Sequence, residues 1–421
     1  MCSGLEEGED NLMRNYTEAD INDFLNQHDY DIRKSHDARW IDQKCTMDVV
    51  SLIADCILQF TSLDTTKEFT VADIWHNKYT VDNVQQIFAK PNPDKKAENE
   101  YDKYFGQPIK LLGYSRILNC DVRSGRNYYT INNYELLEFI SIRERNAFTF
   151  LCCYIEKVLK DSGIYTMFEE FYEKPNNDTY LHVKKGFSSF TIKNTPINGE
   201  VECNRIFIKV LNPLACKYRT LGTVKGRLSK DNITFDMIAY NQRNWRDLYS
   251  EKPKDMTRVE YEKTLPAQDE DKMTTYRINK AKQFIRAYND KYRNGRTELI
   301  EKNHMQDLAS QIHHIFPVAY YPEIADFYEN LIALTPTQHY TYAHPNNNTQ
   351  YVDRMYQYFC LIAKAGNIKE NLTNKELPTI YSFDDFKYVL NVGLETNEFD
   401  EVEDMDFDGL TRLIDMFYDA A

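Results

Sequence analysis

The sequence contains no C-x-x-C pair, no long apolar run, no internal repeat and no low-complexity tract. Without paired cysteines, the common Cys-based structural zinc motifs are excluded. The longest uncharged apolar run, residues 147–155, is far too short to cross a bilayer, so we expect no membrane partner. The nine cysteines are an odd number without paired spacing, which predicts reduced thiols in a cytoplasmic protein.

An excess of positive charge is missing as well, since 51 Lys and Arg face 65 Asp and Glu. The net charge is −14, but residues 1–30 carry −7 and residues 391–421 carry −9, which leaves the rest of the chain at about +2. We interpret the acidic ends as solvated. The sharper alternative is that residues 398–408 compete with phosphates and suppress non-specific DNA binding. The acidic first residues also predict that no secretory signal opens the chain.

Basic residues are concentrated in two internal segments. Residues 201–250 hold nine Lys or Arg against four acids, and residues 277–296 hold seven against Asp290 alone. Each cationic side chain that displaces a counterion from a phosphate adds salt-dependent affinity for nucleic acid. The second segment predicts a helix, either solvated or in contact with DNA. We expect four of its side chains to bind DNA: Arg277, Lys280, Lys282 and Arg286.

Histidines are concentrated between residues 304 and 344, where five of the nine lie. The sequence Gln-Ile-His-His-Ile-Phe-Pro at 311–317 predicts one short strand, and Leu-Ile-Ala-Leu at 331–334 predicts a second. Thr335 and Pro336 supply an N-cap and a first-turn proline, so a helix that begins there carries His339. The segment therefore predicts two strands around a loop, closed by a helix.

These residue types suit a phosphodiesterase with one metal ion. Imidazole binds a divalent ion through one nitrogen and hydrogen-bonds through the other, and its unperturbed pKa suits water activation. Neighbours on a strand point to opposite faces, so we expect His313 to face the metal and His314 to face the attacking water. A His-His pair alone is usually structural, and only together with Asn330 and His339 does it indicate a nuclease.

This pattern resembles the HNH, or ββα-metal, endonucleases. Their signature is a His-His or Asp-His pair on the first strand, an Asn before the second strand, and a His or Asn on the helix. By position, the resemblance implies that His313 and His339 bind the metal, that His314 is the general base, and that Asn330 fixes the orientation of this base. The resemblance covers only about residues 305–345, and the Cys pairs that brace many HNH domains are missing.

A further histidine, His344, follows His339 by five residues. At 100° per residue it would lie roughly 140° round an α-helix, away from the ligand face. We therefore expect His344 to contact a DNA phosphate, with a role in ending the helix before Pro345 as the alternative.

The N-terminal third predicts a module that reads DNA. Apolar spacing predicts four short helices and then a hairpin, over residues 46–60, 71–75, 81–88, 98–112 and 115–132. Short helices followed by a small hairpin resemble a winged-helix domain, in which a helix enters the major groove and the hairpin contacts the backbone. Arg116, Arg123 and Arg126 would then bind DNA from the hairpin. Winged helices also serve as protein-interaction modules, and that alternative stays open.

The central region is expected to mix helix and strand. Residues 133–162 predict one long helix, buried over 148–155, while 189–193 and 205–211 resemble strands. The fold class we expect is a helix-rich α+β protein with a winged-helix-like domain, a mixed central region and a C-terminal ββα-metal motif. In chain order we expect an acidic arm, a winged-helix-like DNA-recognition domain, a central core with a basic segment, a linker, an HNH nuclease domain and a C-terminal helical region with an acidic end, at residues 1–40, 41–135, 136–250, 251–275, 276–360 and 361–421.

The function that this pattern predicts is sequence-specific cleavage of double-stranded DNA, as in a type II restriction endonuclease of the HNH class. We expect Mg²⁺ or Mn²⁺ as the ion, with Zn²⁺ as the alternative. Because one HNH centre cuts one strand, a homodimer that matches a palindromic site is expected. Two alternatives remain: a winged-helix DNA-binding regulator with an inactive HNH-like segment, and a homing or modification-dependent nuclease.

Overall fold

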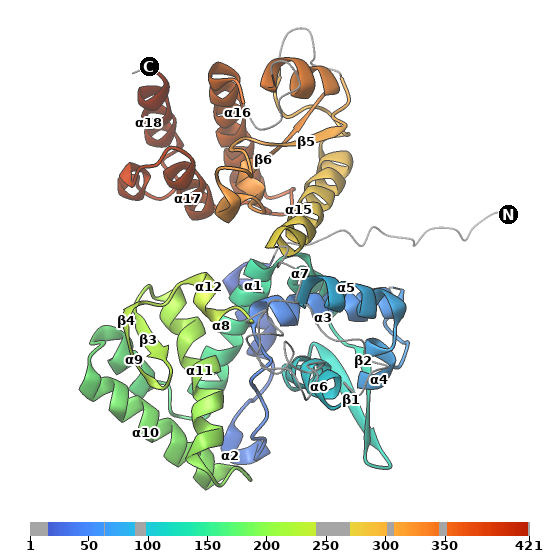
Figure 1. Ribbon diagram of the computed structural model, residues 1–421, viewed down its shortest axis with the longest axis vertical. Helices are drawn as coiled ribbons and strands as arrows, with labels where there is room; N and C mark the ends of the chain where they lie inside the picture. Colours follow the sequence, from blue (N-terminus) through green and yellow to red (C-terminus); the bar gives the residue numbers. More distant parts are fainter. Residues whose placement is uncertain are drawn as a thin grey trace, which may run out of the picture. The chain divides into compact units, whose positions relative to one another are not determined.

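The chain folds as two compact units, unit 1 within residues 1–267 and unit 2 within residues 268–421. The computed structural model describes residues 16–62, 64–88, 98–240, 270–300, 307–344 and 352–419. Both units consist mainly of helices, and the strands of the described residues form three separate two-stranded antiparallel sheets (Figure 1). The expected helix-rich α+β class is confirmed.

Unit 1 combines helices with two hairpins. Its elements are α1 (Glu18–Leu25), α2 (Ile32–Ser35), α3 (Met47–Thr61), α4 (Val71–Trp75), α5 (Lys78–Phe88), α6 (Glu98–Tyr114), β1 (Leu118–Arg123), β2 (Arg126–Ile131), α7 (Tyr134–Ile142), α8 (Glu144–Asp161), α9 (Thr166–Glu173), α10 (Asn177–Asn194), α11 (Glu200–Lys217), β3 (Leu221–Val224), β4 (Arg227–Asn232) and α12 (Phe235–Ile238).

The core of unit 1 is built on α3 and α8, which pack against each other and against α7. Residues 150–155 of α8 are all buried, as their apolar run predicts. The expectation of one helix over 133–162 is wrong, because the backbone is extended at Arg143 (φ −154°, ψ 155°). Asn146 stabilises this break: its amide donates to the Phe139 carbonyl at 2.8 Å and accepts from Arg143 Nε at 2.9 Å.

The two strand-like runs of the central region are helical. Residues 189–193 belong to α10 and residues 205–211 to α11, so the strand expectation is wrong. In α11 the buried residues recur at helical spacing, at Ile206, Phe207, Val210, Leu211 and Leu214. Packing of this face against α8 and α10 overrides the local preference of β-branched and aromatic residues for strands.

The helices α3 to α6 are followed by the β1–β2 hairpin, which is the order that a winged-helix domain requires. Arg123 pairs with Arg126 across a two-residue turn, in which Ser124 and Gly125 both have positive φ (51° and 76°). Turns of this kind match the twist of a hairpin, and glycine adopts them without strain. The winged-helix assignment itself stays a prediction.

In the described part of unit 2, helices surround one short hairpin. Its elements are α15 (Glu270–Tyr292), β5 (Gln311–His314), the short helices η1 (Pro322–Ile324) and η2 (Tyr328–Asn330), β6 (Leu331–Leu334), η3 (Gln338–Ala343), α16 (Arg354–Thr373), α17 (Phe383–Gly393), η5 (Glu398–Glu401) and α18 (Phe407–Asp419). Helix α15 packs against both strands, and α16 packs against α18 and η3. All four residues of β6 are buried, so this strand forms the centre of unit 2.

The two units are fewer than the domains expected from the sequence. Residues 41–135 and 136–250 pack together in unit 1, and residues 276–360 and 361–421 pack together in unit 2. From residue 16 onwards the expected acidic arm is part of unit 1, because α1 packs against α8. Most of the expected linker, residues 251–269, lies outside the described residues. Every helix among the described residues is too short or too polar to span a bilayer.

Candidate metal centre

The β5–β6 hairpin brings the predicted histidines into one structure. The strands are antiparallel, with His313 opposite Ile332 and His314 opposite Leu331. The pleat directs the two imidazoles to opposite faces, as expected for neighbours on a strand. His313 is buried and faces η3, whereas His314 is half-buried and faces the loop between the strands.

The helical segment after β6 is a π-helix over residues 338–343. The backbone N–H of His344 donates to the carbonyl of His339 at 3.1 Å, five residues earlier. Such a bond closes a turn that holds one residue more than an α-helical turn, so His344 follows His339 on the same face. The expectation that His344 lies off the ligand face is therefore wrong, since it assumed α-helical geometry.

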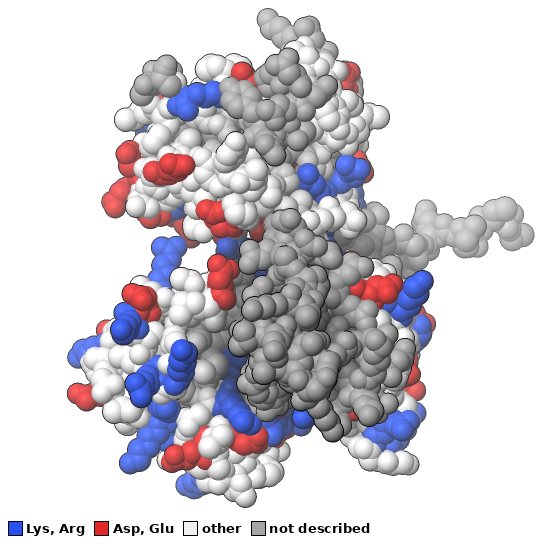
Figure 2. Space-filling model, in the orientation of Figure 1, with Lys and Arg blue, Asp and Glu red and all other residues white. Residues whose placement is uncertain are grey.

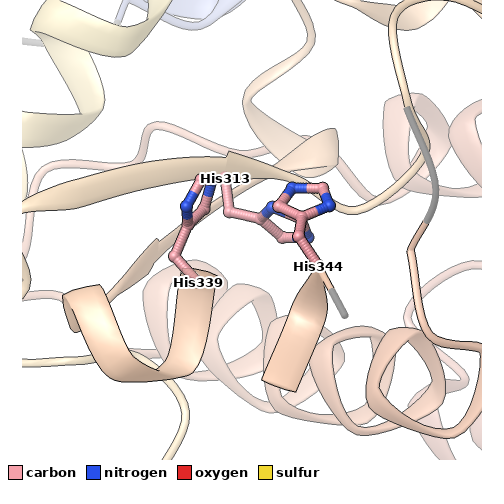
Figure 3. Close-up of side chains that lie close together, drawn as sticks. All are labelled: His313, His339 and His344. Carbon is pink, nitrogen blue, oxygen red and sulfur yellow. The ribbon is translucent and has the colours of Figure 1, made fainter. Parts of the chain in front are cut away.

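His313, His339 and His344 form a cluster, with one nitrogen of each ring within 4.8 Å of the others. Figure 3 shows the three rings gathered between the strand and the helical segment. Their centroids lie 5.2 Å (His313–His339), 4.9 Å (His313–His344) and 4.8 Å (His339–His344) apart. His344 is buried here and is not placed on the surface for the DNA contact that we expected.

Two nitrogens of the cluster are buried without a partner. Nε2 of His313 and Nδ1 of His339 have no hydrogen-bond partner among the described residues. A buried polar atom without a partner costs about 1–3 kcal/mol, so native proteins rarely leave one unpaired. A metal ion would satisfy both atoms at once, and the three residues fit such an ion in number and in type.

The surroundings keep these ligands neutral. Burial lowers the pKa of His313 well below its ordinary value, and the neighbouring histidines add to this effect. Burial, together with His344 and Lys282, lowers the pKa of His339 to about 4. At neutral pH both imidazoles therefore carry the lone pair that a metal requires.

His314 is held in one orientation by the loop between the strands. Its Nε2 lies 3.0 Å from the carbonyl oxygen of Ala325. A carbonyl only accepts, so Nε2 carries the proton and Nδ1 keeps its lone pair. Burial and then Lys282 lower the pKa of His314 to about 3, so the ring is neutral at physiological pH. Nδ1 is thus the atom that can take up a proton, but the lowered pKa makes His314 a weaker base in the free protein than the unperturbed imidazole expected from the sequence.

The Asn330 side chain hydrogen-bonds to the loop and not to the His314 ring. Its side-chain oxygen accepts from the Phe316 N–H at 2.8 Å, and its amide donates to the carbonyls of Phe316 and Ile324 at 3.1 Å each. Ile324 precedes Ala325, which carries the carbonyl bound by His314. Asn330 is therefore hydrogen-bonded to the residue that precedes the one bound by His314, and its predicted role in orienting the base stays a prediction.

Two of the predicted DNA-binding cations on α15 act on the β5 region. The charge of Lys282 contributes to lowering the pKa of His313, His314 and His339. Arg286, one turn further along α15, donates to the carbonyl of Ser310 at 3.0 Å and so ties the helix to the residue before β5. Among the described residues, the charges acting on His314 and His339 come from histidines and Lys282, and none from a carboxylate.

The remaining predicted DNA-binding residues differ in their exposure and in their ion pairs. Arg123 is paired with Glu68 at 2.6 Å and Asp121 at 3.1 Å, so acidic neighbours compensate its charge. Arg116 and Arg126 are exposed at either end of the β1–β2 hairpin region, and Arg277 and Lys280 are half-buried on α15. Figure 2 also shows basic side chains gathered over α10, α11 and the β3–β4 hairpin, where seven cations are exposed: Lys185, Lys193, Arg205, Arg219, Lys225, Arg227 and Lys230.

The sequence analysis missed Gln338, which fixes the start of η3. Its side chain is fully buried and accepts from the Thr335 N–H at 3.0 Å, while the Thr335 hydroxyl accepts from the Gln338 N–H at 3.1 Å. This is a reciprocal capping box, and the pattern Thr-x-x-Gln directly before the helix is its sequence signal. The predicted N-cap at Thr335 is confirmed.

No protein-family model matches the chain, and no curated protein or solved structure matches it either.

Proposed function

We propose that the chain is a metal-dependent endonuclease that hydrolyses phosphodiester bonds of double-stranded DNA. The observation that carries the proposal is that two neighbouring residues of β5 suit two different chemical roles. His313 belongs to a cluster of three imidazoles, in which His313 Nε2 and His339 Nδ1 are buried without a hydrogen-bond partner among the described residues, and His314, the next residue, presents Nδ1 as a base. Hydrolysis of a phosphodiester needs both a Lewis acid at the phosphate and a base at the water.

The residues divide the reaction as follows. His313, His339 and His344 would hold an ion that, when bound, polarises the scissile phosphate and stabilises the leaving oxygen. His314 Nδ1 accepts the proton of the attacking water while its Nε2–H stays on the Ala325 carbonyl. Lys282 supplies positive charge where the phosphate oxygens gain negative charge. The substrate phosphate opposes the Lys282 charge and so raises the pKa of His314 from its value in the free protein.

The donor set favours a transition metal over Mg²⁺. Imidazole nitrogens suit Zn²⁺, Ni²⁺ and other transition ions, whereas Mg²⁺ prefers oxygen ligands and octahedral geometry. The cluster offers three imidazoles. We therefore propose Zn²⁺ as the ion that supports cleavage best, followed by Mn²⁺ and then by Mg²⁺.

Cleavage of DNA at a specific site, as by a type II restriction enzyme, is the form of the activity that we propose. The support is the concentration of cations on α15 beside the cluster, at Lys282 and Arg286, and the order of helices and hairpin in unit 1. A homodimer is part of the proposal, since one centre cuts one strand and a double-strand break needs two.

The test is cleavage of unmethylated phage DNA after chelation and re-addition of single ions. We expect wild-type protein to lose activity on chelation and to recover it with Zn²⁺ or Mn²⁺. His313→Ala should lower metal affinity by more than about 100-fold, because loss of an outer-shell partner alone costs about 10–100-fold. His182→Ala, at an exposed position on α10, is the matched control and should behave like wild type.

The form of the products decides between the alternatives. Discrete fragments support a site-specific enzyme. A smear that His313→Ala abolishes would support a nuclease without sequence specificity and would contradict the restriction-enzyme hypothesis. DNA binding without cleavage, on modified and unmodified DNA with every ion, would replace the proposal with the DNA-binding regulator.

A further inference from the structure

The π-helix η3 begins from a turn that is anchored to a neighbouring segment. Gln338 Oε1 accepts from the Thr335 N–H at 3.0 Å and from the Thr297 hydroxyl at 2.5 Å, and Nε2 donates to the Leu299 carbonyl at 2.9 Å. The amide thus makes three hydrogen bonds in a fully buried position. Residues 297–299 are in turn bound to β6, because the Glu298 N–H donates to the Ala333 carbonyl at 2.9 Å.

The far end of η3 is anchored as well. Ala343 is buried, and its carbonyl accepts from the Asp353 N–H at 2.9 Å, which ties η3 to the start of α16. Both ends of η3 are therefore held by hydrogen bonds to neighbouring segments. A π-helical turn takes up one residue more than an α-helical turn over the same path.

This extra residue decides whether the third imidazole reaches the cluster. With α-helical geometry, His344 would lie roughly 140° from His339 around the axis and could not approach His313. In the π-helix the His344 N–H reaches the His339 carbonyl at 3.1 Å, and both rings lie within 5.2 Å of His313 by their centroids. Isolated π-turns are rare and less favourable than α-helix, so the surrounding structure must hold this one.

We propose that Gln338 is a positioning residue for the metal centre, and that its anchored turn holds η3 in the π-helical register that supplies His344 as the third ligand. The proposal deepens the proposed function and rests on it only in that the three histidines bind a metal. Gln338 does not touch the ion or the substrate, and it acts on His339 and His344 through the backbone that it fixes.

The first test is Gln338→Met, which keeps the length of the side chain and removes the amide. Co²⁺ binding is measured by titration, and the visible absorption of bound Co²⁺ reports the number and geometry of its ligands. We expect an affinity about 10–100-fold lower than wild type and an altered spectrum. Thr337→Ala, at an exposed position on the same turn, is the control and should leave both readouts unchanged.

The second test restores the geometry by another route. Deletion of Thr341 shortens the spacing of His339 and His344 to four residues, which places both imidazoles on one face of an ordinary α-helix. In the Gln338→Met background this deletion should recover most of the lost Co²⁺ affinity and the wild-type spectrum. A residue that contributed only to stability would not be rescued by removing a second residue.

The outcomes separate this inference from the proposed function. If wild type binds Co²⁺ and Gln338→Met binds it equally well with the same spectrum, the positioning role is overturned and the proposed function stands. If the deletion fails to improve binding by folded Gln338→Met protein, the register argument is overturned. If wild type itself binds no Co²⁺, both proposals fail. Should Gln338→Met not fold, Thr297→Val removes one of the two donors to Oε1, and wild-type affinity in that variant would overturn the role.

Discussion

At the scale of single residues, the site depends on imidazoles that stay neutral because they are buried. The pKa of His339 is about 4 and that of His314 about 3 in the folded protein, against an ordinary value of 6.5. At pH values between the folded-state pKa and 6.5, each of these two histidines is protonated in the unfolded chain but not in the folded chain. Folding stability contributed by these groups is therefore present above pH 6.5 and is lost as the pH falls towards 4.

We predict that the unfolding midpoint of the metal-free protein decreases as the pH is lowered from 7 to 4. His339→Asn removes one of the responsible groups, so the decrease between pH 6.5 and 4 should be shallower in this variant than in wild type. His182→Asn serves as the control. Thermal unfolding at several pH values provides the measurement, and identical pH profiles for wild type and His339→Asn would contradict the explanation.

The charge of Lys282, on α15, contributes to lowering the pKa of His313, His314 and His339. If it stabilises the charge that develops on the phosphate, Lys282→Gln should slow single-turnover cleavage by about 100-fold or more while metal affinity changes little. Lys280→Gln, on the same helix, should mainly weaken DNA binding and reduce its salt dependence by about one unit of slope. Equal effects of the two substitutions on the rate with saturating DNA would place Lys282 among general DNA contacts.

At the scale of elements, the sequence predicts the hairpin and misses the details of the helix that follows. Apolar runs beside Gly, Pro and polar turn residues locate β5 and β6, and alternation along a strand separates His313 from His314. The role of His344 is not predictable in this way, because η3 is hydrogen-bonded to Thr297, which is distant in sequence, and to Asp353, which follows η3. No local pattern reports a contact between residues 297 and 338.

In unit 1 as well, the sequence predicts local elements better than features that depend on packing. The apolar spacing of residues 71–75 predicts α4, and the hairpin expected over residues 115–132 contains β1 and β2. The break at Arg143 and the helical state of residues 205–211 were missed, since both depend on packing against α8 and its neighbours. Periodicity predicts an isolated amphipathic element well, but it cannot predict which of two states a buried segment adopts.

A buried ion pair joins α16 to the strand region of unit 2. Lys364 and Glu298 are almost completely buried, with Nζ and Oε2 3.2 Å apart, and Lys364 also donates to the Tyr381 hydroxyl at 2.7 Å. The second carboxylate oxygen of Glu298 accepts from the Ala333 N–H at 3.1 Å. This pair therefore connects α16 to β6, the strand that pairs with His313 and His314.

We predict that Lys364→Met destabilises unit 2 by about 3–5 kcal/mol, because it leaves the Glu298 carboxylate buried without its cation. The double variant Lys364→Met with Glu298→Gln removes the uncompensated charge and should regain a large part of this loss. Urea unfolding of the three proteins measures the difference. A double variant less stable than Lys364→Met alone would show that the carboxylate is stabilised by its other partners.

At the scale of the whole molecule, charge is distributed unevenly along the chain. The acidic residues are concentrated at the two ends of the sequence, and the interior of the chain is close to neutral with two basic segments. A double-strand break by a site that cuts one strand needs two copies of the chain on one target.

We predict that two copies assemble on a cognate duplex. Sedimentation of the His314→Ala protein with a short DNA that contains one site should give a complex of two chains per duplex. A complex with a single chain, together with nicked products in cleavage assays, would mean that the enzyme cuts one strand at a time.

Whether His314 is the general base beside a bound metal is tested most directly by single-turnover cleavage. The rate of metal-loaded wild type is compared with that of metal-loaded His314→Ala. We expect both proteins to bind the same amount of metal, since His314 faces away from the cluster. Cleavage by His314→Ala should fall by about 10²–10⁴-fold, the usual contribution of a general base. Wild-type rates in His314→Ala, with discrete products that still require metal, would contradict the assignment of this strand as the catalytic element.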